Sequence, residues 1–238
     1  MANNHLLLKH KIIQWNINGF QMRRDNIQLL LDNHSPAALC IQETNLYKDQ
    51  DFKYHKSYYT HTGTGHGGVG IIVKDKYVHE PIPLRTSLQA VAVKITLQND
   101  SKYTLCSIYI PPVNELNVSK EELDDLKSQL PSPYILMGDF NAHSSLWGAT
   151  SENKRGEVME EFILDNDLIL FNNKTHTYFS NTHGTTSLID LTICPPSIYL
   201  DFDCHVFENR HDSDHYPIQL TYNSTDDTEI DRFPQWNF

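Results

Sequence analysis

Gly138-Asp139-Phe140-Asn141-Ala142-His143 follows directly after the apolar stretch Tyr134-Ile135-Leu136-Met137. The apolar stretch predicts a short buried strand. Because Asp139 and Asn141 are two residues apart, their side chains project to the same side of an extended chain at the end of this strand. A carboxylate that moves a proton, beside an amide that holds an oxygen, suits hydrolysis of a phosphate ester. Gly, Asp and Asn are equally common in turns, so the run taken alone is also consistent with a plain turn.

The composition predicts one large domain with a substantial core. The chain has 238 residues, 39% of them hydrophobic and 11% aromatic. No apolar run approaches the roughly 18 residues of a membrane-spanning helix, and residues 1–9 lack a signal-peptide pattern. We therefore expect an intracellular protein without a membrane partner. The net charge of -11 argues against strong nonspecific adhesion to nucleic acid, but it is compatible with an enzyme that acts on nucleic acid.

The cysteines indicate neither a structural zinc site nor a redox motif. None of the four (Cys40, Cys106, Cys194 and Cys204) forms a Cys-x-x-Cys pair. Cys40 and Cys106 lie in apolar, strand-like runs and are expected in the core. This usage fits a reducing compartment.

Apolar, β-branched runs recur along the chain and predict strands. They cover 11–16, 37–42, 69–73, 90–95, 103–109, 134–137, 169–171, 188–193 and 218–221. Helical spacing of apolar residues appears at 25–32, at 119–130 after a capping box at Ser119 and Glu122, and at 156–165. Many strands with few helices predict an α+β architecture of two mixed β-sheets packed face to face and flanked by helices.

Two segments are predicted to be surface loops. The first is Tyr59–Gly68, and the second is Asn181–Thr186, which has the composition of a hairpin tip. The polar, acidic stretch 223–231 predicts a linker. It leads to the apolar aromatic end 232–238, which we interpret as a connection to a further region, the alternative being a docked C-terminal segment.

Polar residues repeatedly close the apolar runs, and strand ends can meet at one rim of a layered sheet. Each has an ordinary alternative: Glu43 could be a surface acid, and His215 a buried core histidine. Their joint pattern favours a site. The residues concerned are Asn16, Asn18, Glu43, Tyr109, Asp139, Asn141, Asp190, Asp214 and His215.

Five ordered motifs resemble the series of the endonuclease/exonuclease/phosphatase family. They are Trp15-Asn16-Ile17-Asn18-Gly19, Ile41-Gln42-Glu43-Thr44, Gly138-Asp139-Phe140-Asn141, Ser187-Leu188-Ile189-Asp190 and Ser213-Asp214-His215-Tyr216-Pro217. The resemblance covers about Lys11–Tyr222 and implies a four-layer α/β/β/α sandwich. It implies an endonuclease domain at 1–222 and a linker at 223–238 toward a reverse transcriptase region.

Within this family the chain resembles the endonuclease domain of non-LTR (LINE-type) retrotransposon polyproteins. Asn18 stands where apurinic-site repair enzymes usually carry Asp. The run from Asp139 to His143, followed by Trp147-Gly148 and Arg155-Gly156, is similar to the retrotransposon version. The resemblance implies a nick in double-stranded target DNA, made in the nucleus, with a 3′-hydroxyl that primes reverse transcription. The implied partners are the rest of the polyprotein and the element RNA.

The resemblance also implies roles for the site residues. Glu43 would bind Mg²⁺, or alternatively Mn²⁺, with help from Asn18 and Asp214. Asp139 would orient or deprotonate the attacking water, and Asp190 would hold His215 cationic against the phosphate. Asn16, Asn141 and Tyr109 would hold phosphate oxygens.

Candidate DNA contacts are Arg155 and the hairpin residues Thr182, His183, Thr185 and Ser187. The alternative for Arg155 is an ordinary arginine at the start of a helix, and the alternative for the hairpin residues is a plain surface turn. For the whole chain, the alternatives are an apurinic-site repair nuclease or another phosphoesterase of the same fold, and a non-catalytic DNA-binding module.

Overall fold

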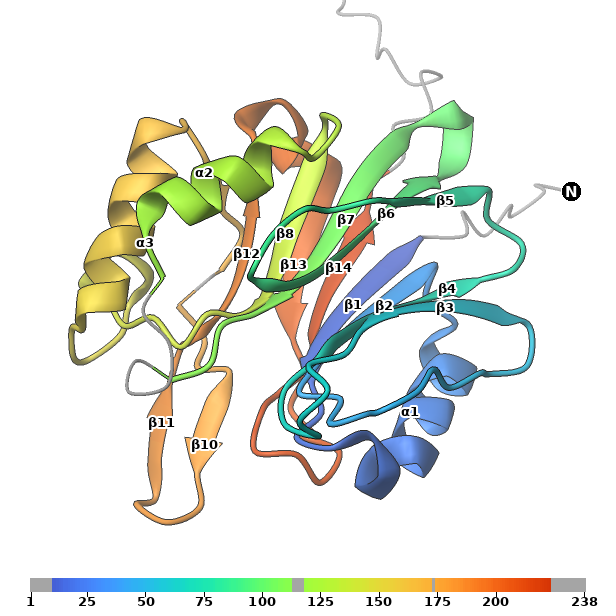
Figure 1. Cartoon of the computed structure of the whole chain (residues 1–238), viewed down its shortest axis with the longest axis horizontal. Coiled ribbons are helices and arrows are strands. Elements are labelled where there is room, and N and C mark those ends of the chain that lie inside the picture. The colour runs from blue at the N-terminus through green and yellow to red at the C-terminus, as the bar shows by residue number, and fades with distance from the viewer. Residues whose placement is uncertain (1–9, 113–117, 173, 224–238) are drawn as a thin grey trace, which may run out of the picture.

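Two six-stranded sheets lie face to face in the computed structural model, which describes residues 10–112, 118–172 and 174–223 (Figure 1). The first sheet has the strand order β13-β14-β1-β2-β4-β3 and the second has β5-β6-β7-β8-β12-β9. β10 and β11 form a separate hairpin. The strands are β1 (Lys11–Asn16), β2 (Ala38–Gln42), β3 (His55–Thr60), β4 (Val69–Lys74), β5 (His79–Ile82), β6 (Gln89–Thr96), β7 (Lys102–Tyr109), β8 (Tyr134–Asp139), β9 (Ile169–Leu170), β10 (Tyr178–Ser180), β11 (Thr185–Ser187), β12 (Asp190–Cys194), β13 (Phe202–Val206) and β14 (Ile218–Tyr222).

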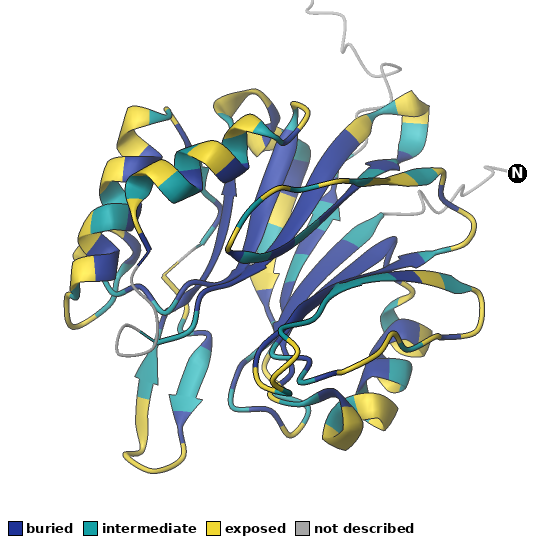
Figure 2. Ribbon diagram, viewed as in Figure 1, coloured by how far each residue is buried: buried dark blue, intermediate teal, exposed yellow. Residues whose placement is uncertain are grey.

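Helices cover the outer faces of both sheets and complete the four layers. α1 (Phe20–His34) packs on the first sheet, and α2 (Lys120–Ser128) and α3 (Lys154–Asp165) pack on the second (Figure 1). Figure 2 shows buried strands between helices that turn exposed faces outward. The predicted α/β/β/α sandwich is therefore confirmed.

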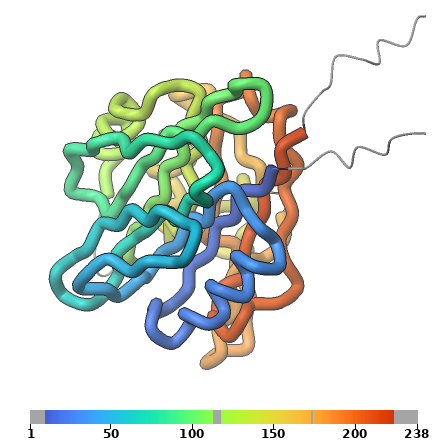
Figure 3. Tube along the Cα trace, turned by 90° about the vertical axis from the view of Figure 1, so that its right-hand side faces the viewer, coloured from blue at the N-terminus to red at the C-terminus, as the bar shows by residue number. Residues whose placement is uncertain are grey.

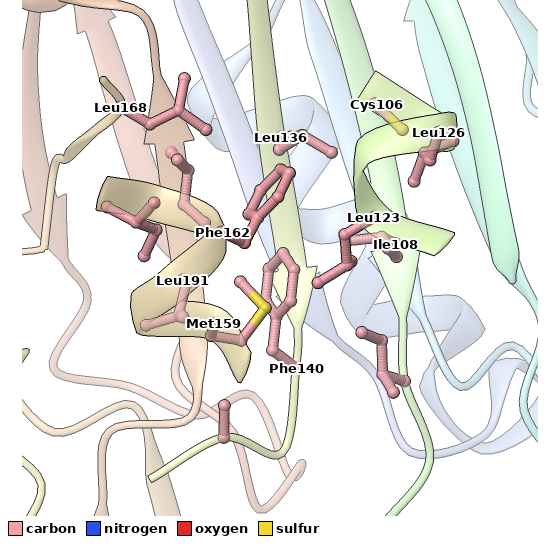
Figure 4. Packing of buried hydrophobic residues seen from close by; sticks show 14 of the residues in the cluster. Cys106, Ile108, Leu123, Leu126, Leu136, Phe140, Met159, Phe162, Leu168 and Leu191 are labelled. Carbon is pink, nitrogen blue, oxygen red and sulfur yellow. The ribbon is translucent and has the colours of Figure 1, made fainter. Parts of the chain in front are cut away.

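The alternation of side chains along β1 shows how the layers are built. Ile12 joins the core between the two sheets, whereas Ile13 and Trp15 join the core beneath α1. Successive residues of a strand point to opposite faces, so one strand contributes to two cores. A third core lies between the second sheet and the helices α2 and α3, where Met159 and Phe162 of α3 pack with Phe140 and Leu191 (Figure 4).

The strand directions bring many of the predicted site residues to one rim. β1 pairs parallel with β2 in the first sheet, and β7 pairs parallel with β8 in the second. A hydrogen bond between Asn16 and Asp139 joins the ends of β1 and β8, so these four strands end at the same edge. β14 and β12 run antiparallel to β1 and β8, so they begin at that edge. Figure 3 shows the first and last strands of the chain, β1 and β14, side by side.

Most predicted elements are present, with different bounds. The capping box at Ser119 and Glu122 is formed, and α2 starts at Lys120. α1 begins at Phe20, five residues before the predicted start, and α3 begins at Lys154. β3, β5 and β13 were not predicted. The predicted loop at Tyr59 begins inside β3, which continues to Thr60.

The four cysteines are free thiols, and Cys40 and Cys106 are fully buried, as predicted. Of the helices in the described part of the chain, none has the length and apolar character required to cross a bilayer. The linker predicted at 223–238 lies outside the described residues, apart from Asn223.

Candidate active site

A polar cleft of about 220 Å³ opens at the rim where the strand ends meet. Larger hollows of about 410 Å³ and 660 Å³ lie elsewhere, but neither contains the converging carboxylates. The cleft is lined by Glu43, Pro112, Asp139, Asn141, His143, Tyr178, Ser187, Ile189, Asp214 and His215.

Asn16, at the end of β1, connects the two sheets within this site. Its Nδ2 donates to Glu43 Oε1 at 2.8 Å and to Asp139 Oδ2 at 2.9 Å. Its Oδ1 accepts a hydrogen bond from the backbone N of Asn18 at 3.0 Å. Both amide hydrogens are thus used to place carboxylates, so this arrangement fits a positioning role better than the predicted hold on a phosphate oxygen.

His215 lies between two buried aspartates. Its Nδ1 is 2.8 Å from Asp190 Oδ2, and its Nε2 is 3.8 Å from Asp139 Oδ2. The three side chains are nearly inaccessible, with exposures of 3% for His215, 0% for Asp190 and 1% for Asp139. Trp15 Nε1 donates to the backbone carbonyl of His215 at 3.1 Å and helps to fix this segment.

The pKa values of Asp139 and His215 are both raised, for different reasons. Burial raises the pKa of Asp139 to about 8, with Asp190 and Glu43 adding to the rise and His215 opposing it. Burial alone would lower the pKa of His215, but Asp190, Asp139 and Asp214 outweigh it and raise that pKa to about 10. The imidazole is therefore cationic at neutral pH.

Asn141 and Tyr109 flank Asp139. The backbone N of Asn141 donates to Asp139 Oδ1 at 2.9 Å, and its Nδ2 donates to Asp139 Oδ2 at 3.2 Å and to the Ile110 carbonyl at 3.1 Å. Tyr109 is buried and pairs in register with Asp139 across β7 and β8. Both amide hydrogens of Asn141 are therefore used within the protein, as in Asn16, and the predicted phosphate contacts of Asn141 and Tyr109 stay predictions.

Three residues of the rim leave their strands with a left-handed backbone: Asn18 (φ 46°), Glu43 (φ 49°) and Asn141 (φ 49°). Such angles are uncommon for residues other than glycine, although Asn adopts them more often than most. They often mark functional sites. The turn after Asn16 lets Asn18 Nδ2 donate to Asp214 Oδ1 at 3.1 Å. The predicted metal residues therefore form two adjoining groups, with Glu43 beside Asn16 and with Asn18 beside Asp214.

The carboxylates of Glu43 and Asp139 suit a hard divalent cation, whereas the cationic imidazole of His215 has no free lone pair with which to coordinate one. One ligand atom from each of Glu43, Asp139 and His215 lies within 4.8 Å of the others. Mg²⁺ prefers carboxylate oxygens and water and needs only one or two carboxylates. Burial is the main cause of the raised pKa of Asp139, and the negative charges of Asp190 and Glu43 add to it, so a bound cation would favour the ionised carboxylate.

Arg155 corrects one sequence-based prediction. Its side chain is only 3% exposed, and Nη1 donates to the backbone carbonyls of Ile110, Pro111 and Phe140. Its guanidinium holds the segments that follow β7 and β8, so the predicted direct DNA contact does not fit.

The predicted hairpin is present and extends from the body of the molecule beside the site (Figure 1). Thr182, His183 and Thr185 are exposed on it, and half-buried Ser187 lines the cleft. These positions are compatible with DNA contact, which stays a prediction.

Tyr178 and the pair Gln14 and Gln42 also belong to the site, although they were not predicted from the sequence. The ring of Tyr178 lies 4.9 Å from that of His215. Gln14 Nε2 donates to Asp190 Oδ1 at 3.0 Å and to Gln42 Oε1 at 2.9 Å. The available signal was positional: Gln14 is a polar residue in an apolar run, two residues before Asn16 and so on the same face of β1.

Comparison with known proteins supports the family predicted from the five motifs. Residues 103–219 match the family model described as endonuclease-reverse transcriptase. The RNA-directed DNA polymerase from mobile element jockey of Drosophila melanogaster is 26% identical over an alignment of 225 positions, which covers 90% of this chain and 24% of that protein. The probable RNA-directed DNA polymerase from transposon BS of the same species is 26% identical over an alignment of 239 positions, which covers 94% of this chain and 25% of that protein. This chain thus spans about a quarter of the length of these relatives.

Solved structures show the same fold. The endonuclease domain of TRAS1, a telomere-specific non-LTR retrotransposon, superposes with a TM-score of 0.76 at 22% identity, covering 90% of this chain and 98% of that one. The AP endonuclease LMAP from Leishmania major gives a TM-score of 0.70 at 12% identity, covering 91% of this chain and 88% of that one.

Proposed function

We propose that this chain, which has the motifs and the fold of the endonuclease/exonuclease/phosphatase family, is a metal-dependent DNA endonuclease. It nicks double-stranded target DNA and leaves a 3′-hydroxyl that primes reverse transcription. The observation that carries this proposal is the meeting of Glu43, Asp139 and His215, from three distant parts of the chain, within 4.8 Å at one rim. The similarity to retrotransposon relatives supports the biological setting.

A phosphodiester is anionic and repels nucleophiles, so its uncatalysed hydrolysis has a high activation barrier. Enzymes in general lower such barriers by about 8–23 kcal/mol. Mg²⁺, or alternatively Mn²⁺, would neutralise charge on the phosphate when bound. Glu43 is the principal ligand in this proposal, and Asn18 and Asp214 assist directly or through water. Asn16 keeps the Glu43 carboxylate in place through its 2.8 Å hydrogen bond.

Asp139 orients the attacking water or removes its proton. Its raised pKa makes it a stronger base than an exposed aspartate, which suits proton transfer near neutral pH. Asn141 fixes the Asp139 carboxylate through two hydrogen bonds, and Tyr109 lies beside it for contact with a phosphate oxygen.

His215 carries positive charge toward the scissile phosphate. Asp190 accepts the Nδ1 hydrogen and leaves Nε2 on the side of Asp139. A cation held in a water-poor site stabilises charge that develops on the phosphate oxygens in the transition state.

The proposed setting is the nucleus, where the target DNA lies, with the remainder of a retrotransposon polyprotein and its RNA as partners. The exposed hairpin residues Thr182, His183 and Thr185 are the proposed DNA contacts. Ser187, at the edge of the cleft, would contact DNA nearest to the scissile bond.

Nicking of intact supercoiled plasmid tests the proposal. We expect relaxed circles in Mg²⁺, none in EDTA, and extension of the nicks by a DNA polymerase without prior end repair. Duplex DNA with one abasic site and a phosphoinositide serve as competing substrates. Preference for either of them over intact plasmid would favour a repair nuclease or a lipid phosphoesterase.

Asp139→Ala and His215→Ala separate catalysis from binding. Both variants should bind plasmid like the parent and fail to nick it. If plasmid is bound but never cut by the parent in either metal, the chain is a DNA-binding module and the catalytic proposal is wrong.

A further inference from the structure

The layer between the two sheets changes from apolar to polar as it approaches the rim. Along β1 the residues facing this layer are Ile12, Gln14 and Asn16 in turn. β2 follows the same order, with Cys40 in the inter-sheet core and Gln42 nearer the rim. A row of polar side chains therefore lies directly beneath the proposed active site.

Gln14, Gln42 and Ser107 form a continuous hydrogen-bonded chain in this layer. Gln14 Nε2 donates to Gln42 Oε1 at 2.9 Å, Gln42 Nε2 donates to Ser107 Oγ at 2.9 Å, and Ser107 Oγ donates to the Ile41 carbonyl at 3.2 Å. Their exposures are 2%, 0% and 0%, so water does not compete for these bonds.

The chain of hydrogen bonds ends on Asp190. Gln14 Nε2 also donates to Asp190 Oδ1 at 3.0 Å, whereas Asp190 Oδ2 faces His215 Nδ1 at 2.8 Å. Thr177 Oγ1 and Asn172 Nδ2 bind the backbone of Asp190, not its carboxylate. Within the described residues, the carboxylate is thus oriented from two sides, by Gln14 from the first sheet and by His215.

The residue type at position 14 suits this task. Its side chain reaches from β1 across the inter-sheet layer to β12, and it offers a neutral donor that leaves the negative charge of Asp190 available to His215. Gln14 Oε1 has no hydrogen-bond partner among the described residues, although it is buried. An orphaned buried oxygen costs stability, so packing alone would favour an apolar residue here.

We propose that Gln14 is a positioning residue that holds the Asp190 carboxylate in the rotation that directs His215 at the scissile phosphate. This inference rests on the proposed nuclease function and adds a residue to it. Gln14 touches neither DNA nor metal, and it acts through Asp190.

The test compares Gln14→Met with Gln219→Met. Methionine keeps the length and volume of glutamine but cannot donate to Asp190. Gln219 lies on β14 next to β1 and is half-buried, and its side-chain Nε2 donates to Thr221, so its replacement controls for an added methionine in this sheet. We expect kcat for plasmid nicking to fall about 10–100-fold in Gln14→Met, as for other groups that orient a reactive residue, with KM within twofold. Gln219→Met should match the parent.

A spectroscopic readout makes the result independent of cleavage. The His215 Nδ1 proton, bonded to Asp190, should give a downfield proton NMR signal in the metal-free parent and in Gln219→Met. In Gln14→Met it should move upfield or disappear. If the parent does not nick DNA, the proposed function fails, and this signal still decides the role of Gln14.

A double-mutant comparison excludes a general structural effect. In an Asp190→Asn background, Gln14→Met should cause little further loss of kcat, because both changes act through one carboxylate. Should Gln14→Met fail to fold, Gln14→Leu likewise has no donor for Asp190 and should lose as much activity. An unchanged His215 signal in a folded Gln14 variant, or an equal loss of kcat in both backgrounds, would overturn the proposal.

Discussion

Asp139 and Asp190 stand directly opposite each other on the antiparallel strands β8 and β12, and the imidazole of His215 lies between their carboxylates. Like charges at directly opposed positions of a sheet are destabilising. The cationic imidazole offsets that repulsion, with Nδ1 at 2.8 Å from Asp190 and Nε2 at 3.8 Å from Asp139. Protonation of Asp139 and protonation of His215 therefore influence each other.

We expect the metal-free protein to lose stability as the pH rises from 6 to 9. The folded-state pKa of Asp139 is raised to about 8 and that of His215 to about 10, so the folded protein binds more protons than the unfolded chain in this range. The stabilisation is complete below the unfolded pKa values, about 3.9 and 6.5 respectively, and is lost as the pH passes the folded ones. Urea unfolding in EDTA measures it. The double variant Asp139→Asn/His215→Gln should show a weaker dependence, and a rise in parent stability over this range would contradict the expectation.

Asp190→Asn should lower the pKa of His215. The negative charge of Asp190 and its hydrogen bond are what outweigh the burial of the imidazole, so without them the neutral form is favoured near neutral pH. NMR titration of the His215 ring protons gives the value. His10, whose pKa is lowered by burial and whose Nδ1 lies 2.8 Å from the Tyr77 hydroxyl, serves as an internal control and should keep its parent pKa. An unchanged His215 titration would show that Asp190 does not keep it charged.

Glu43→Gln should weaken Mn²⁺ binding and nicking together. The substitution keeps the shape but removes a carboxylate from the group that includes Asp139 and His215, and we expect affinity to fall by at least about 10–100-fold. Mn²⁺ titration followed by electron paramagnetic resonance measures binding. Glu161→Gln, on the exposed surface of α3, removes one negative charge elsewhere and should change neither property. Full binding by Glu43→Gln would remove Glu43 from the proposed metal site.

Gly138→Ala should be strongly destabilising. A Cβ at this position would lie 1.8 Å from the Ile108 carbonyl oxygen of the neighbouring strand, so the strand pair that carries Asp139 would have to separate. We expect a loss of about 3 kcal/mol or more in the free energy of unfolding. Gly63→Ala is the matched control, because Gly63 has φ +76° but nothing within 4 Å. It should cost only the left-handed penalty of about 1–2 kcal/mol, and equal losses in both variants would refute the close-packing argument.

Replacing the hairpin turn 181–184 with Asn-Gly should change where DNA is nicked more than how fast. The turn lies outside the cleft, whereas the residues proposed for catalysis lie within or beneath it. Mapping nick positions on random-sequence DNA tests this. Leu200→Ala, at an exposed position after the far end of β12, should leave the pattern unchanged. An identical pattern after the hairpin change would exclude the hairpin from site choice.

The sequence predicted those parts of the fold whose signal is local. The apolar run before Asp139 marks a central strand, and Ser119 with Glu122 marks a helix start, because both patterns depend on neighbouring residues. β3 was missed because it is an edge strand in which only Ser57 is buried, so its composition resembles that of a loop. β5 contains Pro81, which is tolerated at an edge but argues against a strand in sequence.

In the candidate site, too, residues with a local sequence signal were predicted and residues that depend on distant contacts were not. The strand-end motifs identified Glu43, Asp139 and His215 as candidates, and the fold brings them together. Arg155 was misassigned because its sequence context does not reveal the three carbonyls that surround it after folding. Gln14 was missed because its partner Asp190 is 176 residues away in the chain.

The position of β14 between β1 and β13 has a consequence for biosynthesis. β1 leaves the ribosome well before β14, so one of its edges stays unpaired until residues 218–222 have followed. Asp214 and His215 immediately precede β14. A nascent chain therefore carries an incomplete sheet and an incomplete site until β14 has been made, and the proposed cutting activity cannot precede completion of that strand.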